Sequence, residues 1–100
     1  MELKRRHKWK AGRHCWVANG ICYIPLKEGM IAICDEDRFT EVNRYDWRLS
    51  QGWPCGDIGY KHVRLHRFLY PDIPMIDHIN RDRLDNRSCN LRPCDHFINT

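Results

Sequence analysis

The last third of the chain contains four polar residues whose types and spacing are suited to metal-assisted hydrolysis. Asp77 and His78 are adjacent. Asn90 follows His78 by twelve residues, and Asn99 follows it by twenty-one. An imidazole titrates near neutral pH and can therefore remove a proton from water. Carboxylate and carboxamide oxygens are hard ligands that suit Mg²⁺ or Mn²⁺. The set thus offers one base and an all-oxygen site for one divalent metal ion, for which we expect Mg²⁺, with Mn²⁺ as the alternative.

The elements that must position these residues are a short strand and a turn. Apolar residues at positions 75, 76 and 79 predict a strand over 75–79. Neighbouring side chains on a strand point to opposite faces, so Asp77 and His78 reach one pocket only if the strand ends beside them. The polar run 80–83 has strong turn character and predicts that end just after His78.

Each of these residues also has an ordinary interpretation when it is taken alone. A single histidine is more often a surface or core residue than a catalytic base, and asparagines are common in turns and caps. The order of the elements favours chemistry. An upstream Leu-His-Arg at 65–67 precedes Asp-His, the segment 84–87, an Asn-Leu-Arg at 90–92, and Asn99, all within thirty-five residues.

This pattern resembles the motif of the HNH endonucleases, in the variant whose last position is Asn. The resemblance implies that His78 is the general base and that Asp77 and Asn99 hold the metal ion. It implies a structural role for Asn90, whose amide would tie the loop to its frame. It also implies a two-stranded hairpin, over 75–79 and 90–94, packed around the metal on a helix that begins near Asp95, a residue suited to cap it. The implied activity is cleavage or nicking of DNA by one-metal hydrolysis, as in phage or homing-type enzymes.

Two further histidines are candidates for lining the site. In one interpretation His66 lines the site or its frame and Arg67 contacts a phosphate, because many proteins of this group carry Leu-His-Arg just before the motif. In the other, residues 65–70 form a packing helix that turns both polar side chains outward. His96 lies three residues before Asn99 and so on a similar helix face. If His96 enters the metal site, the mixed ligand shell favours Zn²⁺ or Ni²⁺ over Mg²⁺.

Positive charge is concentrated in the first fourteen residues. Six lysines and arginines against Glu2 give this arm +5, whereas the whole chain is +4, so the remainder sums to −1. Such a block either binds polyanions, largely without sequence readout, or only aids solubility. Beside the nuclease-like motif we interpret it as a DNA-binding arm. The expected DNA-binding residues are Lys4, Arg5, Arg6, Lys8, Lys10, Arg13, Lys61, Arg64, Arg67, Arg81, Arg83, Arg87 and Arg92.

Length and composition limit the class of protein. One hundred residues make a single small domain with a limited core. The mean hydropathy is −0.71, and neither a long apolar run nor an apolar segment near Met1 is present. The sequence therefore predicts no transmembrane helix and no signal peptide. We expect no membrane partner and a cytoplasmic location, that of a bacterial host if the gene is carried by a phage.

The six cysteines do not form a paired metal-binding pattern. No Cys-x-x-Cys occurs, and Cys22 and Cys34 replace apolar residues in strand-like runs, which favours small buried thiols. A structural zinc site on Cys89, Cys94 and a histidine is the disfavoured alternative.

The segment between the arm and the motif is typical of a β-rich subdomain. Apolar runs predict strands over 21–26 and 30–34 around a turn at 27–29. Acidic residues followed by apolar ones at 39, 42 and 45 predict a short amphipathic helix within 35–47. Strands over 47–49 and 60–65 should flank a loop at 52–54. Trp16, Trp47 and Trp53 are interpreted as core residues rather than base-stacking platforms.

The expected fold class is α+β. It comprises a basic arm (1–14) and a small β-rich N-terminal subdomain (15–58). This subdomain is expected to pack on a C-terminal ββα-metal motif (59–100) made of a hairpin and a helix.

The position of Asn99 as the penultimate residue leaves the expected helix from Asp95 little more than one turn, which is marginal without packing support. The explanations left open are a truncated sequence, a shortened gene, and a partner protein or second copy that completes the helix. Two functions accordingly remain: a DNA endonuclease, or a catalytically impaired DNA-binding protein that keeps a truncated nuclease fold.

Overall fold

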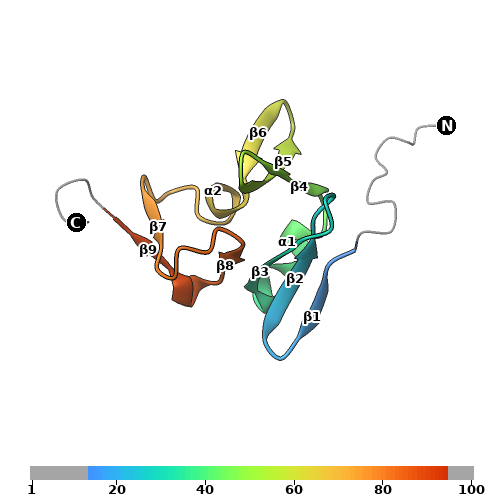
Figure 1. The fold of residues 1–100 in the computed structure, drawn as a ribbon, viewed down its shortest axis with the longest axis horizontal. Coiled ribbons are helices and arrows are strands. Elements are labelled where there is room, and N and C mark those ends of the chain that lie inside the picture. Colours follow the sequence, from blue (N-terminus) through green and yellow to red (C-terminus); the bar gives the residue numbers. More distant parts are fainter. Residues whose placement is uncertain (1–13, 95–100) are drawn as a thin grey trace.

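The structure is a computed structural model that describes residues 14–94, arranged as three small sheets joined by short helices (Figure 1). The first sheet has the order β1 (Trp16–Ala18), β2 (Ile21–Pro25), β3 (Ile31–Asp35) and β8 (Asp85–Asn86). The second is β4 (Trp47–Ser50), β5 (Trp53–Ile58) and β6 (Lys61–Arg64), and the third pairs β7 (Ile76–His78) with β9 (Leu91–Pro93). The helical segments are η2 (Glu36–Arg38), α1 (Phe39–Val42), α2 (Leu65–Leu69) and η3 (Ser88–Asn90).

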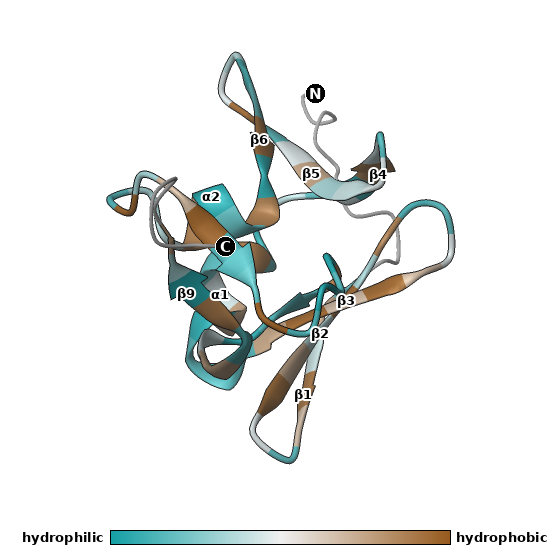
Figure 2. Ribbon diagram, turned by 60° about the vertical axis from the view of Figure 1, so that its left-hand side comes forward, coloured by the Kyte–Doolittle hydropathy of each residue, from teal (hydrophilic) through white to brown (hydrophobic). Residues whose placement is uncertain are grey.

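The β2–β3 hairpin supplies much of the core. Its residues alternate in burial, so that Cys22, Ile24, Ala32 and Cys34 are fully buried and their neighbours are not. This is the period of two expected for strands with one face on a core. Hydrophobic residues of the two strands lie side by side in Figure 2. The predicted strands and the turn between them are confirmed.

An aromatic cluster joins this hairpin to the second sheet. Trp47 is 1% exposed, and its indole N–H donates to the Val42 carbonyl at 2.8 Å. The rings of Tyr45 and Phe68 lie edge-on to Trp47, at centroid distances of 6.5 and 5.4 Å. Lys27 N–H donates to the Trp47 carbonyl at 3.0 Å, which links the end of the first hairpin to β4. Trp47 is thus a core residue, as predicted.

A parallel pairing connects the first hairpin to the C-terminal part of the described chain. β8 lies beside β3, with Ile33 opposite Asp85 and Cys34 opposite Asn86. The backbone N–H of Ile33 also donates to the Leu84 carbonyl at 2.8 Å. Because β3 is part of the buried core, this pairing fixes the loop that follows β7 against a rigid element.

The expected α+β fold class is wrong. The described residues form mostly strands, in three sheets, and the longest helix among them, α2, has five residues. The β7–β9 hairpin is present in the predicted place, with Asp77 opposite Arg92. The described residues contain no helix packed on that hairpin as a ββα motif, and the expected helix from Asp95 lies outside them.

The short amphipathic helix predicted within 35–47 extends only as far as Val42. Only η2 and α1 form, and Val42 is their one buried residue. Trp47 belongs to β4 instead, where it pairs with Gly56, so the chain must leave the helix before it. The tertiary requirement for a buried tryptophan in the sheet thus overrides the apolar spacing.

The loop predicted at 52–54 is wrong for Trp53 and Pro54, which belong to β5, the central strand of the second sheet. Pro54 hides this strand from sequence reasoning, because proline cannot donate to a ladder. Its position resolves the conflict: pairing of β5 with β6 begins only at Cys55, so Pro54 lies beyond the end of β6. The predicted domain boundary at residue 58 falls in the β5–β6 hairpin, and the division into subdomains stays a prediction.

Two further findings concern the helices and the cysteines of the structure. No helix in residues 14–94 has the length and apolar character needed to cross a bilayer. All six cysteines are free thiols, and Cys15, Cys22, Cys34 and Cys55 are buried. Burial raises the pKa of the Cys55 thiol, as expected for a group in the core.

Candidate active site

His78, the predicted general base, lies at the end of β7 and points into the protein. It is 7% exposed, and its Nε2 lies 2.9 Å from Oδ1 of Asn86. The Asn86 amide is oriented by a second bond, because its Nδ2 donates to the Arg83 carbonyl at 3.0 Å. Oδ1 must therefore accept from His78, which assigns the proton of the neutral imidazole to Nε2. The lone pair is then on Nδ1, the atom free to accept a proton.

Asn86 can orient His78 because the sheet holds it rigidly. It is fully buried and lies in β8, opposite Cys34 of β3. The predicted turn after β7 returns the chain to this position: Arg81 N–H donates to the His78 carbonyl at 2.9 Å. Arg81 itself has a φ of 65°, the left-handed conformation that tight turns use.

Asn90, the predicted frame residue, ties this turn to η3. Its Oδ1 accepts from the backbone N–H of Asn80 at 3.0 Å. Its Nδ2 donates to the Asn80 side-chain oxygen at 2.9 Å and to the Asp85 carbonyl at 2.8 Å. The Asn90 carbonyl also accepts from the Ile79 N–H at 2.8 Å. These bonds hold both ends of the segment that carries Asn86.

The Asp85 carboxylate closes the same network. Arg87 donates to its two oxygens at 2.8 and 2.7 Å, and Asn80 donates to it at 3.0 Å. The Arg87 hydrogen bonds lower the pKa of Asp85, and they outweigh burial, which acts in the opposite direction. A charged, buried aspartate with all its partners in place stabilises the segment without being available to a ligand.

His66 lies on α2 with its ring edge-on to His78, at a centroid distance of 5.2 Å. It is 6% exposed, so the interpretation that turned it outward is wrong. Burial lowers the pKa of His66 to about 4, and the neighbouring positive groups of His78, Arg67 and Arg64 act in the same direction. It is therefore neutral at pH 7. Its Nδ1 is buried and has no hydrogen-bond partner within the described residues.

Trp53 forms the third wall of the site. Its ring centroid lies 5.1 Å from that of His66 and 5.9 Å from that of His78. The indole is half-buried, at the start of β5. The three rings therefore form one cluster, contributed by β5, α2 and β7.

Asp77, the predicted metal ligand, has a different environment from His78. It pairs across the β7–β9 hairpin with Arg92, whose Nη2 lies 2.9 Å from Oδ2. The strand does end after His78 as predicted, yet alternation still sends the two side chains to separate partners. Asp77 offers one partly exposed carboxylate, and carboxylate oxygens are ligands that Mg²⁺ prefers. Asn99 and His96 lie outside the described residues, and residues 14–94 contain no group of three side chains that could hold a metal ion.

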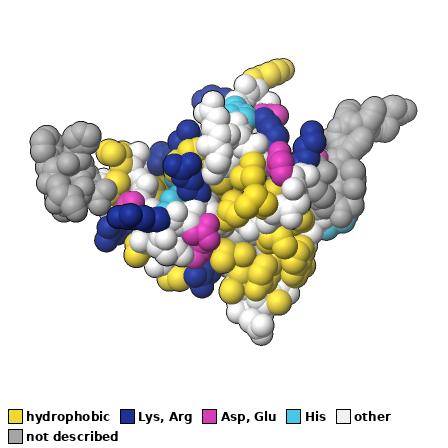
Figure 3. All heavy atoms as spheres, in the orientation of Figure 1, with side chains coloured by type: hydrophobic (Ala, Val, Ile, Leu, Met, Phe, Trp, Pro, Cys, Tyr) yellow, Lys and Arg dark blue, Asp and Glu magenta, His cyan; other side chains and the backbone are white. Residues whose placement is uncertain are grey.

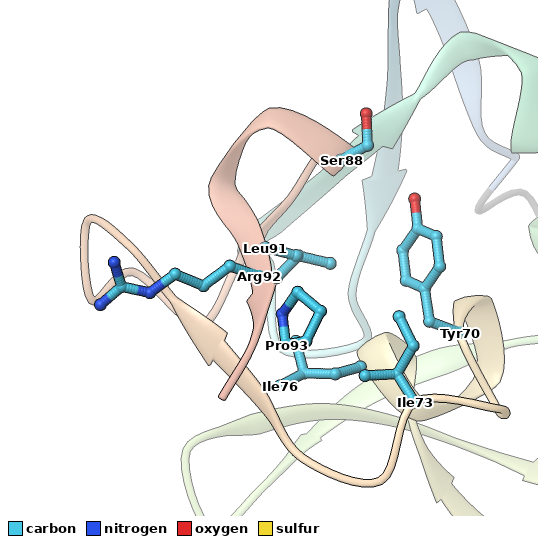
Figure 4. A pocket seen from close by; sticks show the side chains of 7 residues that line it. All are labelled: Tyr70, Ile73, Ile76, Ser88, Leu91, Arg92 and Pro93. Carbon is cyan, nitrogen blue, oxygen red and sulfur yellow. The ribbon is translucent and has the colours of Figure 1, made fainter. Parts of the chain in front are cut away.

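A small pocket of about 70 Å³ lies beside the hairpin rather than at His78 (Figure 4). Its lining is mainly apolar: Tyr70, Ile73, Ile76, Ser88, Leu91, Arg92 and Pro93. Figure 4 shows the Arg92 side chain extending away from the others, towards the β7 turn. The pocket contains no catalytic candidate, so we do not assign it to the reaction.

The predicted DNA-binding residues fall into three groups. Arg87 and Arg92 are ion-paired to carboxylates, and Arg67 donates to the carbonyls of Ile73 and Pro71. Lys61, Arg64, Arg81 and Arg83 are exposed. Lys4, Arg5, Arg6, Lys8, Lys10 and Arg13 lie outside the described residues. Lysine and arginine side chains gather beside a histidine over α2 and towards β8 (Figure 3).

Sequence reasoning missed two residues of the site. Asn86 is a buried partner of His78, whereas its setting in a polar run suggested an ordinary turn residue. Trp53 lies against both histidines, whereas we predicted a core role. Asn86 carried a signal in its place within the segment 84–87, which belongs to the ordered pattern. Trp53 carried none, since its contact with the histidines depends on the packing of β5 against α2.

Comparison with known proteins gives one informative similarity. The chain is 33% identical, over 90 residues, to an uncharacterized HNH endonuclease of Acanthamoeba polyphaga mimivirus. The match covers 77% of this chain and 47% of the viral protein, so the chain spans about half the length of that relative. No family model matches the sequence, and no solved structure matches it. Over three quarters of its length, the chain is therefore similar to a viral protein that bears the name of an HNH endonuclease.

Proposed function

We propose that this chain is a metal-dependent DNA endonuclease of the HNH type, with His78 as the general base. The observation that carries the proposal is the fixed orientation of His78. Asn86 accepts a hydrogen bond from its Nε2, which leaves Nδ1 to take a proton from water. The similarity to a protein named as an HNH endonuclease supports the same class of reaction.

The neighbours of His78 support its role as a base. His66 and Trp53 pack against its ring and restrict its motion, while the buried His66 remains neutral and adds no charge. A base held in one tautomer and one orientation loses little entropy when it meets its water.

The proposed metal ligands are Asp77 and Asn99. When bound, a divalent ion supplies positive charge that stabilises the transition state of phosphodiester hydrolysis. Asp77 is suited by its carboxylate and partial exposure, although binding requires it to exchange Arg92 for the ion. With oxygen ligands only, we propose Mg²⁺ or Mn²⁺.

The Asp77–Arg92 ion pair favours a second candidate function. A guanidinium on the carboxylate occupies the group that would bind the metal ion. A protein that kept this pair would bind DNA without cutting it.

A nicking assay on supercoiled plasmid separates the two functions. The endonuclease should convert plasmid to the open circle with Mg²⁺ or Mn²⁺ and not with EDTA. Asp77→Ala should abolish nicking, whereas Asp72→Ala, which removes an exposed aspartate from the loop before β7, should not. If a gel shift shows that the protein binds plasmid, and no metal ion supports nicking, the chain is instead the DNA-binding protein.

A further inference from the structure

Two exposed arginines are held against Trp53 at the rim of the histidine cluster. Arg64 Cζ lies 4.4 Å and Arg83 Cζ 4.2 Å from the centroid of the Trp53 ring. The same indole lies against His66 and His78. We call Arg64, Trp53 and Arg83 the arginine stack.

The two arginines of the stack have no acidic partner among the described residues. Within residues 14–94, neither guanidinium has a hydrogen bond or an ion pair. By contrast, four other arginines are paired with carboxylates: Arg38 with Glu41, Arg48 with Asp57, Arg87 with Asp85, and Arg92 with Asp77. Two positive charges without an acidic partner therefore lie against the single indole of Trp53. A bound anion would reduce the repulsion between these charges.

The backbone holds both arginines in place. Arg64 is the last residue of β6 and immediately precedes α2. The Arg83 carbonyl accepts from Asn86 at 3.0 Å, so Arg83 is tied to the residue that orients His78. Gly52 permits the close approach of the Arg83 side chain, because a Cβ there would lie 2.9 Å from its Nη1. Gly52 also has a φ of 82°, which favours glycine.

Stacking on an aromatic ring orients a guanidinium group and leaves its N–H groups available to bind phosphate. The aromatic face contacts the flat face of the group, so the N–H donors in its plane remain available. Arginine donors of this kind match two oxygens of one phosphate. Since Trp53 also contacts both histidines, an anion on the stack lies beside His78.

We propose that the arginine stack binds a backbone phosphate of double-stranded DNA and so places a phosphodiester beside His78. The placement beside His78 rests on the proposed nuclease function, whereas the binding of DNA phosphate by the stack does not. Trp53 acts as a positioning residue, and Arg64 and Arg83 make the contact.

The test is the affinity of the full chain for a fluorescent duplex of about 20 base pairs, measured by anisotropy in EDTA at several salt concentrations. Arg64→Gln and Arg83→Gln should each weaken binding about 5-fold or more and lower the salt slope by about one. Arg44→Gln is the matched control, because it removes the same charge from an exposed arginine that is not among the expected DNA-binding residues. Its affinity should change less than about 2-fold.

Wild-type affinity and slope in both stack variants would overturn the proposal, as would an equal loss in Arg44→Gln. Inorganic phosphate at matched ionic strength should not displace the duplex. Displacement would show a site for free phosphate and overturn the assignment to DNA. A single-stranded RNA that binds more tightly than the duplex, with the same dependence on the stack, would do so too.

The role of Trp53 is tested by a pair of substitutions that leave both charges in place. Trp53→Phe keeps an aromatic face and should keep near wild-type affinity. Trp53→Leu removes that face and should weaken binding about 3-fold or more, with the salt slope retained. Equal affinity of the two variants would overturn the positioning role. If Trp53→Leu fails to fold in a thermal melt, the two arginine variants still decide the proposal.

Failure of the proposed nuclease function is distinguishable in this design, because binding in EDTA requires no cleavage. Loss of binding in the stack variants of a chain that never nicks plasmid would support the phosphate site and contradict the endonuclease. If the wild type nicks plasmid and the stack variants bind DNA as tightly as the wild type, the endonuclease is supported and the phosphate site is contradicted.

Discussion

At the scale of single residues, the site depends on a hydrogen bond between two side chains that are eight positions apart. Asn86 fixes the tautomer of His78, and its own orientation is fixed by the Arg83 carbonyl. Sequence reasoning could select His78 by its type and spacing. It could not select Asn86 among several asparagines, because only the pairing of β8 with β3 buries this one.

Replacing the neutral partner of His78 with an acidic one should change the pH dependence of cleavage. Asn86→Asp keeps the shape of the side chain but places a carboxylate beside Nε2, which favours the protonated imidazole. The acid limb of the pH–rate profile should therefore move to higher pH, with lower activity near pH 6 and recovery at alkaline pH. Asn43→Asp, a similar change distant from the site, should leave the profile unchanged. An unshifted acid limb in Asn86→Asp would contradict this arrangement.

Removal of the Asn90 amide should destabilise the protein as well as reduce its activity. Its loss leaves the Asn80 N–H and the Asp85 carbonyl without their partners. We expect Asn90→Ala to lower the free energy of unfolding by roughly 2–4 kcal/mol in chemical denaturation. Ser88→Ala, in the same turn but exposed, should change it by less than about 0.5 kcal/mol. An Asn90→Ala protein of unchanged stability and no activity would indicate a chemical role instead.

At the scale of elements, local patterns predicted those strands that bury one face and failed where tertiary contacts decide. The alternation in β2 and β3 sufficed for that hairpin, and the apolar residues around Asp77 sufficed for β7. The short helix predicted within 35–47 ends at Val42 because Trp47 pairs in β4, and Pro54 concealed the beginning of β5. The burial of His66 in α2 likewise follows from packing against Trp53 and His78.

The buried histidine of α2 should make the protein sensitive to acid. The pKa of His66 is about 4 in the folded protein and 6.5 without perturbation, so the unfolded chain binds more protons between these values. His66 therefore costs no stability above pH 6.5, and its cost grows as the pH falls towards 4, to about 3 kcal/mol. His66→Phe should show a shallower loss of stability over this range in urea unfolding. Carboxylates such as Asp85 contribute equally to the pH dependence of both proteins. If the stability of the two proteins falls equally with pH, the low pKa of His66 is contradicted.

At the scale of the whole molecule, charge is divided between the arm and the remainder. Residues 1–14 carry +5 and the rest −1. In the described part, Arg64 and Arg83 lie against Trp53 beside the histidine cluster, and lysine and arginine side chains gather on the same face (Figure 3). A binding surface that combines the two would depend on salt more steeply than the arginine stack does alone.

Deletion of residues 1–14 should weaken DNA binding and flatten its dependence on salt, because fewer counterions are released. With six basic residues removed, the slope should fall by up to about five. A variant with the six basic residues changed to Gln controls for the length of the arm and should behave like the deletion. Unchanged affinity and slope after deletion would reduce the arm to an aid to solubility.

The most direct test of His78 as the general base is chemical rescue. His78→Ala removes an imidazole enclosed by His66, Trp53 and Asn86, and leaves a space in which free imidazole can take its place. We predict that this variant, once shown to fold by a thermal melt, nicks plasmid at least about 100-fold more slowly than wild type. Added imidazole should restore part of the rate, whereas His62→Ala, at an exposed position paired with Asp57, should need no rescue. A His78→Ala protein that cuts DNA at the wild-type rate without imidazole would contradict the assignment and move the base to another residue, His66 first.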